Sequence, residues 1–272
     1  MKDIFLVFPR MNISIKAPED VLDNIRRSYF FSAQDSPPGP IHHSYEIRKE
    51  ENKWLFHKDG SLKNVYHNHQ QIIFGLENNI EYSMILQCGD WVAFHAGSVA
   101  VGDQACLAVG NPDTGKSSST FNLIELGHEF LCEEVALVDP EIKSVFPFLQ
   151  SLKLDKNFLN EAEQDFPVRK GDIYSQDPNI IRYTPREAIK KPVLLGTILI
   201  PKYDPSAKTR TTELSPGESL TELLGYCFPP NVDEEKLFDN MIKITESCDV
   251  FRITYRNVKE ARLLLEQLFP ID

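Results

Sequence analysis

The sequence predicts an α/β fold whose sheet mixes parallel and antiparallel strands. The apolar run at residues 105–109 is typical of a buried strand, a glycine-rich loop follows at 110–117, and residues 118–126 carry apolar side chains at helical spacing. Residues 91–101 are also strand-like, and a two-residue turn at 102–103 leads them back antiparallel into the next strand. Strand-like and helix-like segments then alternate to the C-terminus, which is the pattern of an α/β domain.

Composition narrows the class of protein. The chain has 272 residues, which fits one large domain or two small ones, and its 42% apolar and 25% charged residues are ordinary for a soluble globular protein. A net charge of −11 argues against a general nucleic-acid-binding protein. We expect no membrane span and no signal peptide. Five cysteines without a CxxC pair indicate reduced thiols and a cytoplasmic location.

We divide the chain into two parts. Residues 1–88 form an N-terminal β-rich subdomain of unknown role, and residues 89–272 form a second domain that contains the glycine-rich loop. In the first part, Ser36 to Pro40 is a proline-rich loop. The other elements expected there are short strands within 4–15, a helix at 20–27, a hairpin of 44–48 with 53–57 and a turn at 58–61, and a helix at 68–87 that breaks near Asn78-Asn79.

The second part alternates strands and helices beyond the glycine-rich loop. Gly127 ends the first helix, and residues 140–180 are expected to be loops around short strands. Capping boxes predict helices that begin at Thr184-Pro185-Arg186-Glu187 and at Ser215. The remaining expected elements are strands at 130–138, 193–201, 210–213 and 250–255, a helix capped by Asn231 or Asp233, and a helix at 258–268.

The glycine-rich loop is a complete match to a phosphate-binding pattern. Its residues are Gly110, Asn111, Pro112, Asp113, Thr114, Gly115, Lys116 and Ser117, with Ser118 continuing into the helix. Successive backbone N–H groups and the helix N-terminus then surround one anionic position. Lys116 would reach the β- and γ-phosphates of ATP, and the Ser117 hydroxyl would bind Mg²⁺. The alternative is a glycine-rich turn that binds nothing.

A carboxylate pair, Glu133-Glu134, stands within the otherwise apolar strand at 130–138. Burial of two carboxylates is costly unless they are paired or bound to a metal. Adjacent strand residues point to opposite faces, so only one faces the loop unless a bulge turns both inward. The alternative is a strand end that emerges into solvent.

A histidine, His95, lies on the strand before the loop, where a hydrogen-bonded core residue is the commoner role. Residues 94–98, the hairpin into 110–117, residues 126–130 and the acid pair together resemble the C-terminal catalytic domain of HPr kinase/phosphorylase. That family shares its nucleotide-binding core with ATP-dependent phosphoenolpyruvate carboxykinase. The resemblance covers about Trp91 to Asp139 and continues more weakly through Pro201 and 214–224, whereas residues 1–88 contribute no motif.

The resemblance implies a P-loop core and roles for individual residues. Glu134 takes the position of the family's catalytic base, and Glu133 and His95 would orient metal and phosphate. The family has Asp at both acidic positions, so each carboxylate here is one methylene longer. Arg169-Lys170-Gly171 matches the family's Arg-Gly loop poorly, and HPr as substrate therefore does not carry over. Arg182 and Arg186 are either phosphate clamps or solvent-facing arginines.

The predicted function is an ATP-dependent, Mg²⁺-requiring kinase that phosphorylates a serine or another hydroxyl of a peptide or protein. A second interpretation is a nucleotide-binding regulatory or assembly protein without phosphoryl transfer. A third, a small-molecule enzyme of the carboxykinase type, lacks the large cluster of metal and carboxylate ligands that such chemistry needs. The expected partner is a peptide or protein, with no nucleic acid and no membrane, and a homo-oligomer remains an option.

Overall fold

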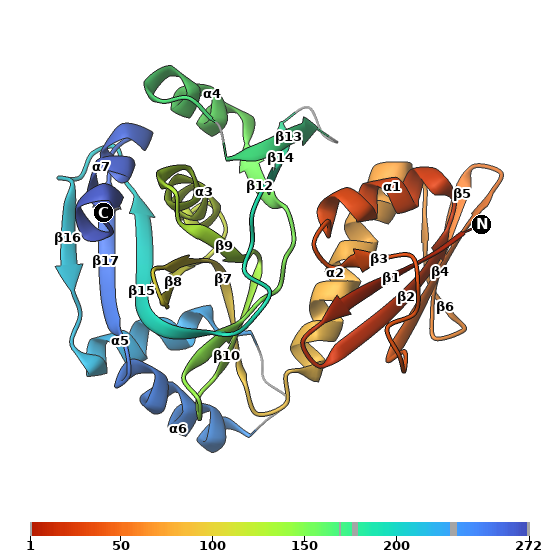
Figure 1. The fold of residues 1–272 in the computed structure, drawn as a ribbon, viewed down its shortest axis with the longest axis horizontal. Helices are drawn as coiled ribbons and strands as arrows, with labels where there is room; N and C mark the ends of the chain where they lie inside the picture. Colours follow the sequence, from red (N-terminus) through yellow and green to blue (C-terminus); the bar gives the residue numbers. More distant parts are fainter. Residues whose placement is uncertain (1, 169, 176–178, 229–232, 271–272) are drawn as a thin grey trace. The chain divides into compact units, whose positions relative to one another are not determined.

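The computed structural model describes residues 2–168, 170–175, 179–228 and 233–270 (Figure 1). The chain forms two compact units, one of Met1–Gln87 with Leu149–Ser151 and one of Cys88–Phe148 with Leu152–Asp272. The return of residues 149–151 to the first unit has no signal in the sequence, which we divided once, at residue 88. Within the described residues, no helix is long and apolar enough to cross a membrane.

The first unit is built on a mixed sheet with the strand order β3-β1-β2-β4-β5-β6. The predicted hairpin of 44–48 with 53–57 is confirmed, because β4 pairs antiparallel with β5. The short strands expected within 4–15 are β1 and β2, which pair antiparallel with each other. The turn after Lys58 leads into a further strand, β6, which we did not predict because its side chains are mostly exposed and show no apolar alternation. The strands are β1 (Lys2–Phe8), β2 (Met11–Ala17), β3 (Ala33–Gln34), β4 (His43–Glu50), β5 (Lys53–Lys58) and β6 (Ser61–Tyr66).

Helices α1 (Glu19–Ser28) and α2 (His69–Gln87) pack against this sheet and against each other. The expected break at Asn78-Asn79 is wrong, since α2 runs through it without interruption. The Asn79 side-chain amide donates to the carbonyl of Gly75 at 2.8 Å, one turn earlier, and Leu76 and Ile80 are fully buried. Core packing therefore overrides the weak helix propensity of two asparagines.

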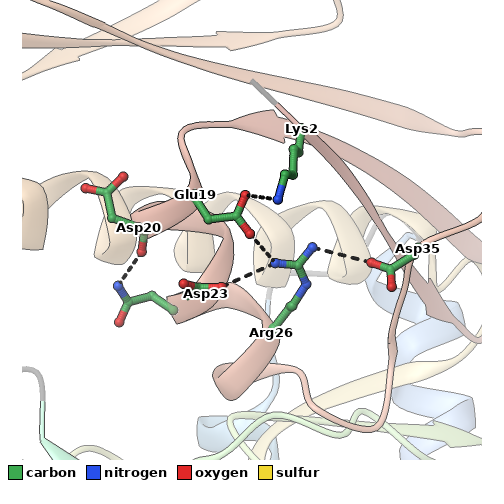
Figure 2. A network of polar contacts seen from close by, with 7 residues as sticks. Lys2, Glu19, Asp20, Asp23, Arg26 and Asp35 are labelled. Atoms are coloured by element: carbon green, nitrogen blue, oxygen red, sulfur yellow. Dashed lines mark hydrogen bonds and ion pairs between the residues drawn. The ribbon is translucent and has the colours of Figure 1, made fainter.

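A network of charged side chains covers α1 (Figure 2). Arg26 contacts Glu19 at 3.2 Å, Asp23 at 3.3 Å and Asp35 at 3.4 Å, and Lys2 contacts Glu19 at 3.0 Å. These contacts link the start of β1 and the loop after β3 to the same helix. The carboxylates are well exposed, so each ion pair is screened by water and contributes little.

Replacement of Arg26 by alanine is therefore expected to lower the free energy of unfolding by less than about 1 kcal/mol. Ile25→Ala, at the fully buried neighbouring position, is expected to cost about 2–5 kcal/mol because it leaves a cavity. Urea denaturation of the two variants measures both values. A larger loss for Arg26→Ala than for Ile25→Ala would mean that the network, and not the core, holds this helix.

The second unit contains a larger mixed sheet with the order β11-β10-β7-β8-β15-β17-β16, in which β9 also pairs with β7. The central strands β8, β15 and β17 are mutually parallel, and their neighbours are antiparallel. This confirms the mixed α/β class. The strands are β7 (Val92–Val101), β8 (Gln104–Val109), β9 (Glu129–Cys132), β10 (Val135–Asp139), β11 (Ser144–Phe146), β15 (Val193–Tyr203), β16 (Arg210–Glu213) and β17 (Asp249–Tyr255).

The second unit also contains a small antiparallel sheet, which consists of β12 (Leu152–Asp155), β14 (Ile180–Pro185) and β13 (Gly171–Ser175). Helix α3 (Lys116–Leu126) packs against β12 as well as against β7 (Figure 1). The helix expected at Thr184 is wrong, because β14 continues to Pro185 and pairs there with Gly171. Strand pairing therefore overrides a local capping signal. The helices of the unit are α3 (Lys116–Leu126), α4 (Lys156–Asp165), α5 (Pro216–Leu223), the short 3₁₀ helix η1 (Leu224–Tyr226), α6 (Glu234–Thr245) and α7 (Val258–Leu268).

The caps of α3, α5 and α6 are the ones that the sequence predicts, whereas α4 and its cap were not predicted. Ser215 and Glu218 form the predicted capping box of α5, and Asp233 caps α6, whereas the alternative cap Asn231 lies outside the described residues. Gly127 ends α3 in the left-handed conformation, with φ of 115°. We did not predict α4, which begins where the Asp155 carboxylate accepts hydrogen bonds from two backbone N–H groups.

Candidate functional site

The site lies at the carboxyl ends of the parallel strands. Because β8, β15 and β17 run in the same direction, their last residues meet at one edge of the sheet, where open α/β sheets bind ligands. The glycine-rich loop leaves β8 at this edge. Tyr203 and Tyr255, which end β15 and β17, are directly paired there, with ring centroids 6.1 Å apart.

The loop is shaped by two left-handed residues and a close contact. Asp113 has φ of 65° and Gly115 has φ of 104°. A side chain at Gly115 would collide with the hydroxyl of Tyr255, so glycine is required there for space as well as for conformation. Helix α3 begins at the next residue with no side-chain cap and no acidic residue in its first turn. Its N-terminal N–H groups are therefore available to an anion.

Lys116 is folded over the loop. Its ammonium donates to the carbonyl of Asn111 at 3.3 Å, and its side chain is buried. Burial lowers the pKa of Lys116, while the charges of Glu133 and Glu134 act against that lowering. The lysine is thus held inside the loop, close to both members of the acid pair.

The acid pair does not lie within a regular strand. The single strand expected at 130–138 is wrong, because β9 ends at Cys132 and β10 begins at Val135. Between them the Val135 N–H donates to the carbonyl of Glu133 at 2.8 Å, which closes a three-residue turn around Glu134. Glu134 has φ of 64°, a left-handed conformation that costs a non-glycine residue about 1–2 kcal/mol. Such strain is concentrated at functional sites.

This turn directs Glu133 to the loop and Glu134 to two residues outside it. Glu133 accepts a hydrogen bond from the Ser117 hydroxyl at 2.5 Å. Glu134 lies 3.1 Å from Nε2 of His95 through one oxygen and 3.3 Å from the ammonium of Lys153 through the other. The structure thus brings together the predicted residues His95, Lys116, Ser117, Glu133 and Glu134. The alternation of a regular strand would have separated the last two.

The two carboxylates have opposite electrostatic environments. Burial, together with the charge of Glu134, raises the pKa of Glu133, which is 1% exposed. Burial also acts to raise the pKa of Glu134, but the hydrogen bond with His95 and the charge of Lys153 outweigh it, so this pKa lies below its ordinary value. Glu134 is therefore an ionised carboxylate at neutral pH.

Glu133 and Ser117 provide oxygen ligands of the kind that Mg²⁺ prefers. In the described part of the chain, Oε2 of Glu133 is buried and has no hydrogen-bond partner. The same residues contain no group of three or more His, Cys, Asp or Glu arranged to hold a metal ion. A Mg²⁺ ion would take these few protein ligands and complete its coordination with phosphate oxygens and water, as is usual for this ion. The residues present fit that mode of binding.

A pocket of about 400 Å³ adjoins the loop. It combines polar residues of the loop with an aromatic and apolar wall from β12, α4, α7 and the ends of β15 and β17. Lys153 and Asp155 of β12 lie on its rim, and we did not predict them because we expected loops in this part of the sequence. The wall consists of Leu154, Phe158, Tyr203, Tyr255, Val258 and Ala261.

The two candidate phosphate clamps differ in position. Arg182 is buried on β14 and lies directly opposite Lys153 of β12. Arg186 lines a separate pocket with Gly127 and His128, at the opposite end of α3 from the loop, and its side chain is 65% exposed. The structure therefore does not bring Arg186 to the loop. Arg169 lies outside the described residues.

Comparison with known proteins finds similarity to solved structures. No family profile and no curated protein matches the chain. Among solved structures, the HPr(Ser) kinase/phosphatase of Coxiella burnetii is 13% identical, and the match covers 65% of this chain and 92% of that one with a TM-score of 0.30. These values indicate a distant structural relation, and the interpretation of the site therefore rests on the residues of this chain.

Proposed function

We propose that the protein is a Mg²⁺-dependent phosphotransferase that uses ATP to phosphorylate a hydroxyl, of serine in particular, on a peptide or protein. The observation that carries the proposal is the contact of Glu133 with Ser117 of the glycine-rich loop, beside the contact of Glu134 with His95 on β7. A glycine-rich turn without function has no reason to contact the buried carboxylate of Glu133, whose half-buried neighbour Glu134 has a strained backbone.

Each residue has a role that its geometry supports. Lys116 and the N-terminus of α3 bind phosphate oxygens, and Ser117 and Glu133 hold the metal ion, which neutralises phosphate charge when bound. Glu134, ionised and near the loop, accepts the proton of the acceptor hydroxyl. That oxygen forms a bond to the terminal phosphorus, and the bond from this phosphorus to the ADP oxygen breaks. His95 orients the Glu134 carboxylate.

The pocket supports a nucleotide as the phosphate donor. Its volume of about 400 Å³ lies in the range of small-molecule sites. If the phosphates bind at the loop, the aromatic wall is available to the purine base of the nucleotide. The paired rings of Tyr203 and Tyr255 offer that base a stacking surface.

A regulatory nucleotide-binding protein without phosphoryl transfer is the second candidate. The observation in its favour is that Glu134 is already held by both His95 and Lys153, which leaves its carboxylate engaged. ATP consumption by the purified protein, measured with serine-containing peptides, separates the two candidates. Turnover that depends on the acceptor supports the kinase, and tight binding without turnover supports the regulatory protein.

Mg²⁺ and ATP together are expected to raise the melting temperature of the protein. A ligand at a hundred times its dissociation constant stabilises the folded state by about 2.7 kcal/mol, which corresponds to roughly 5–10 °C for a domain of this size. Differential scanning fluorimetry at millimolar ATP measures the shift. ATP with EDTA is the control and should give a smaller shift, and a flat titration with Mg²⁺ would contradict both candidates.

A further inference from the structure

Lys153 occupies a position that the proposed roles do not yet use. It lies on the rim of the same pocket as Lys116 and Ser117, and its ammonium is 3.3 Å from Oε1 of Glu134. Its side chain is 18% exposed. Among the described residues that line this pocket, Lys116 and Lys153 are the cationic ones.

The backbone of Lys153 is held firmly. β12 pairs with β14 on one side, and the flanking Leu152 and Leu154 are buried. The next residue, Asp155, caps α4. A lysine anchored in this way can move its ammonium by side-chain rotation alone, while its Cα stays fixed at the rim.

Charge balance favours a further cation in this pocket, besides the proposed Mg²⁺. A triphosphate placed at the loop approaches the carboxylates of Glu133 and Glu134, and like charges at short range repel strongly in a buried site. Asp113, Asp155 and Glu161 add further negative charge to the lining. The Mg²⁺ ion proposed at Ser117 and Glu133 and the ammonium of Lys116 offset part of this negative charge, and the second lysine of the pocket offsets more of it.

The position of Lys153 also indicates which phosphate it meets. If Glu134 is the base, it lies near the acceptor hydroxyl, and this hydroxyl attacks the terminal phosphorus. A cation in contact with Glu134 is therefore at the terminal-phosphate end of the site, away from the phosphates held by the loop backbone.

We propose that Lys153 is a second phosphate-binding residue, which contacts the terminal phosphate of a bound nucleoside triphosphate and gives up its ion pair with Glu134 to do so. This inference rests on the proposed function. Binding of a triphosphate then frees one oxygen of Glu134 for the acceptor hydroxyl, whereas a diphosphate leaves the ion pair in place.

The test compares the affinities of ATP and ADP by isothermal titration calorimetry with Mg²⁺. Lys153→Met is expected to weaken ATP binding by about tenfold or more, the usual effect of losing a hydrogen bond between charged groups, and to change ADP binding by less than about threefold. Lys153→Arg keeps the charge and should retain most of the preference for ATP. Lys156→Met, at an exposed lysine on the adjoining helix, is the matched control and should leave both affinities unchanged.

A second variant tests the exchange itself and does not depend on how Lys153→Met folds. Glu134→Gln removes the competing partner of Lys153 and should tighten ATP binding by about two- to fivefold, the range of a partly exposed ion pair. The double variant Glu134→Gln with Lys153→Met should lose this gain. Equal losses for ATP and ADP in Lys153→Met, or no gain in Glu134→Gln, would overturn the inference and leave the proposed function standing. A parent protein that binds neither nucleotide would overturn both.

Discussion

Lys116→Ala is expected to weaken ATP binding by about a hundredfold or more while the fold persists. In the proposed function the ammonium of Lys116 makes charge-assisted hydrogen bonds to the phosphates, and such bonds contribute about 1.5–3 kcal/mol each. Burial lowers the pKa of Lys116, so its charge is held in the folded protein at a desolvation cost that the alanine variant does not have. Titration calorimetry with ATP and Mg²⁺ measures the loss.

The control for this variant is Lys156→Ala, since Lys156 is exposed at the start of α4. It should bind ATP like the parent. Circular dichroism establishes whether Lys116→Ala retains its secondary structure. An unchanged affinity in a natively folded Lys116→Ala protein would show that the loop does not bind phosphate.

Glu134→Gln is expected to reduce phosphate transfer to a hydroxyl by about a hundredfold or more, and not to weaken nucleotide binding. The amide keeps the shape of the side chain and its contact with His95 but cannot accept the proton. The measurement is single-turnover transfer from ATP to a peptide acceptor at saturating nucleotide. A precursor peptide encoded beside the gene is the first acceptor to test.

Glu133→Gln provides the matched comparison, because it makes the same replacement of a carboxylate by an amide at the neighbouring residue. Glu133 contacts Ser117 and has an unpartnered oxygen, so its variant should raise the Mg²⁺ concentration needed for activity more than it lowers the rate at saturating metal. Transfer at the parental rate by Glu134→Gln would show that another group takes the proton. Tight ATP binding by the parent without transfer to any peptide would favour the regulatory interpretation.

Local sequence signals predicted most of the second unit. The glycine-rich loop, the hairpin that precedes it, and the capped helices α5 and α6 are encoded by residues close together in the chain, such as Gly115, Gly127 and Ser215. Where a local sequence signal and a long-range contact favoured different secondary structures, the long-range contact decided the structure. The capping box at Thr184 gave way to pairing of β14, and Asn78-Asn79 gave way to the packing of α2 on its sheet.

The acid pair shows the limit of such signals most clearly. The sequence places Glu133 and Glu134 after the loop, but a strand pattern assigns them to opposite faces. The turn at Glu134, closed by a backbone hydrogen bond, lets Glu133 reach Ser117 of the loop while Glu134 contacts His95 and Lys153. No residue type marks this turn, because its left-handed backbone is stabilised by partners far away in the chain.

The sequence by itself predicted the glycine-rich loop and the elements on either side of it, which depend on residue type and short spacing acting through local backbone geometry. The roles of Glu133 and Glu134 as metal ligand and base came from the family resemblance and stay predictions. The tertiary structure alone decided that Glu133 contacts the loop while Glu134 contacts His95 and Lys153. It also decided that Tyr203 and Tyr255, from the ends of two parallel strands, contribute to the pocket wall. Those features depend on contacts between segments tens of residues apart, and such contacts leave no periodic trace in the sequence.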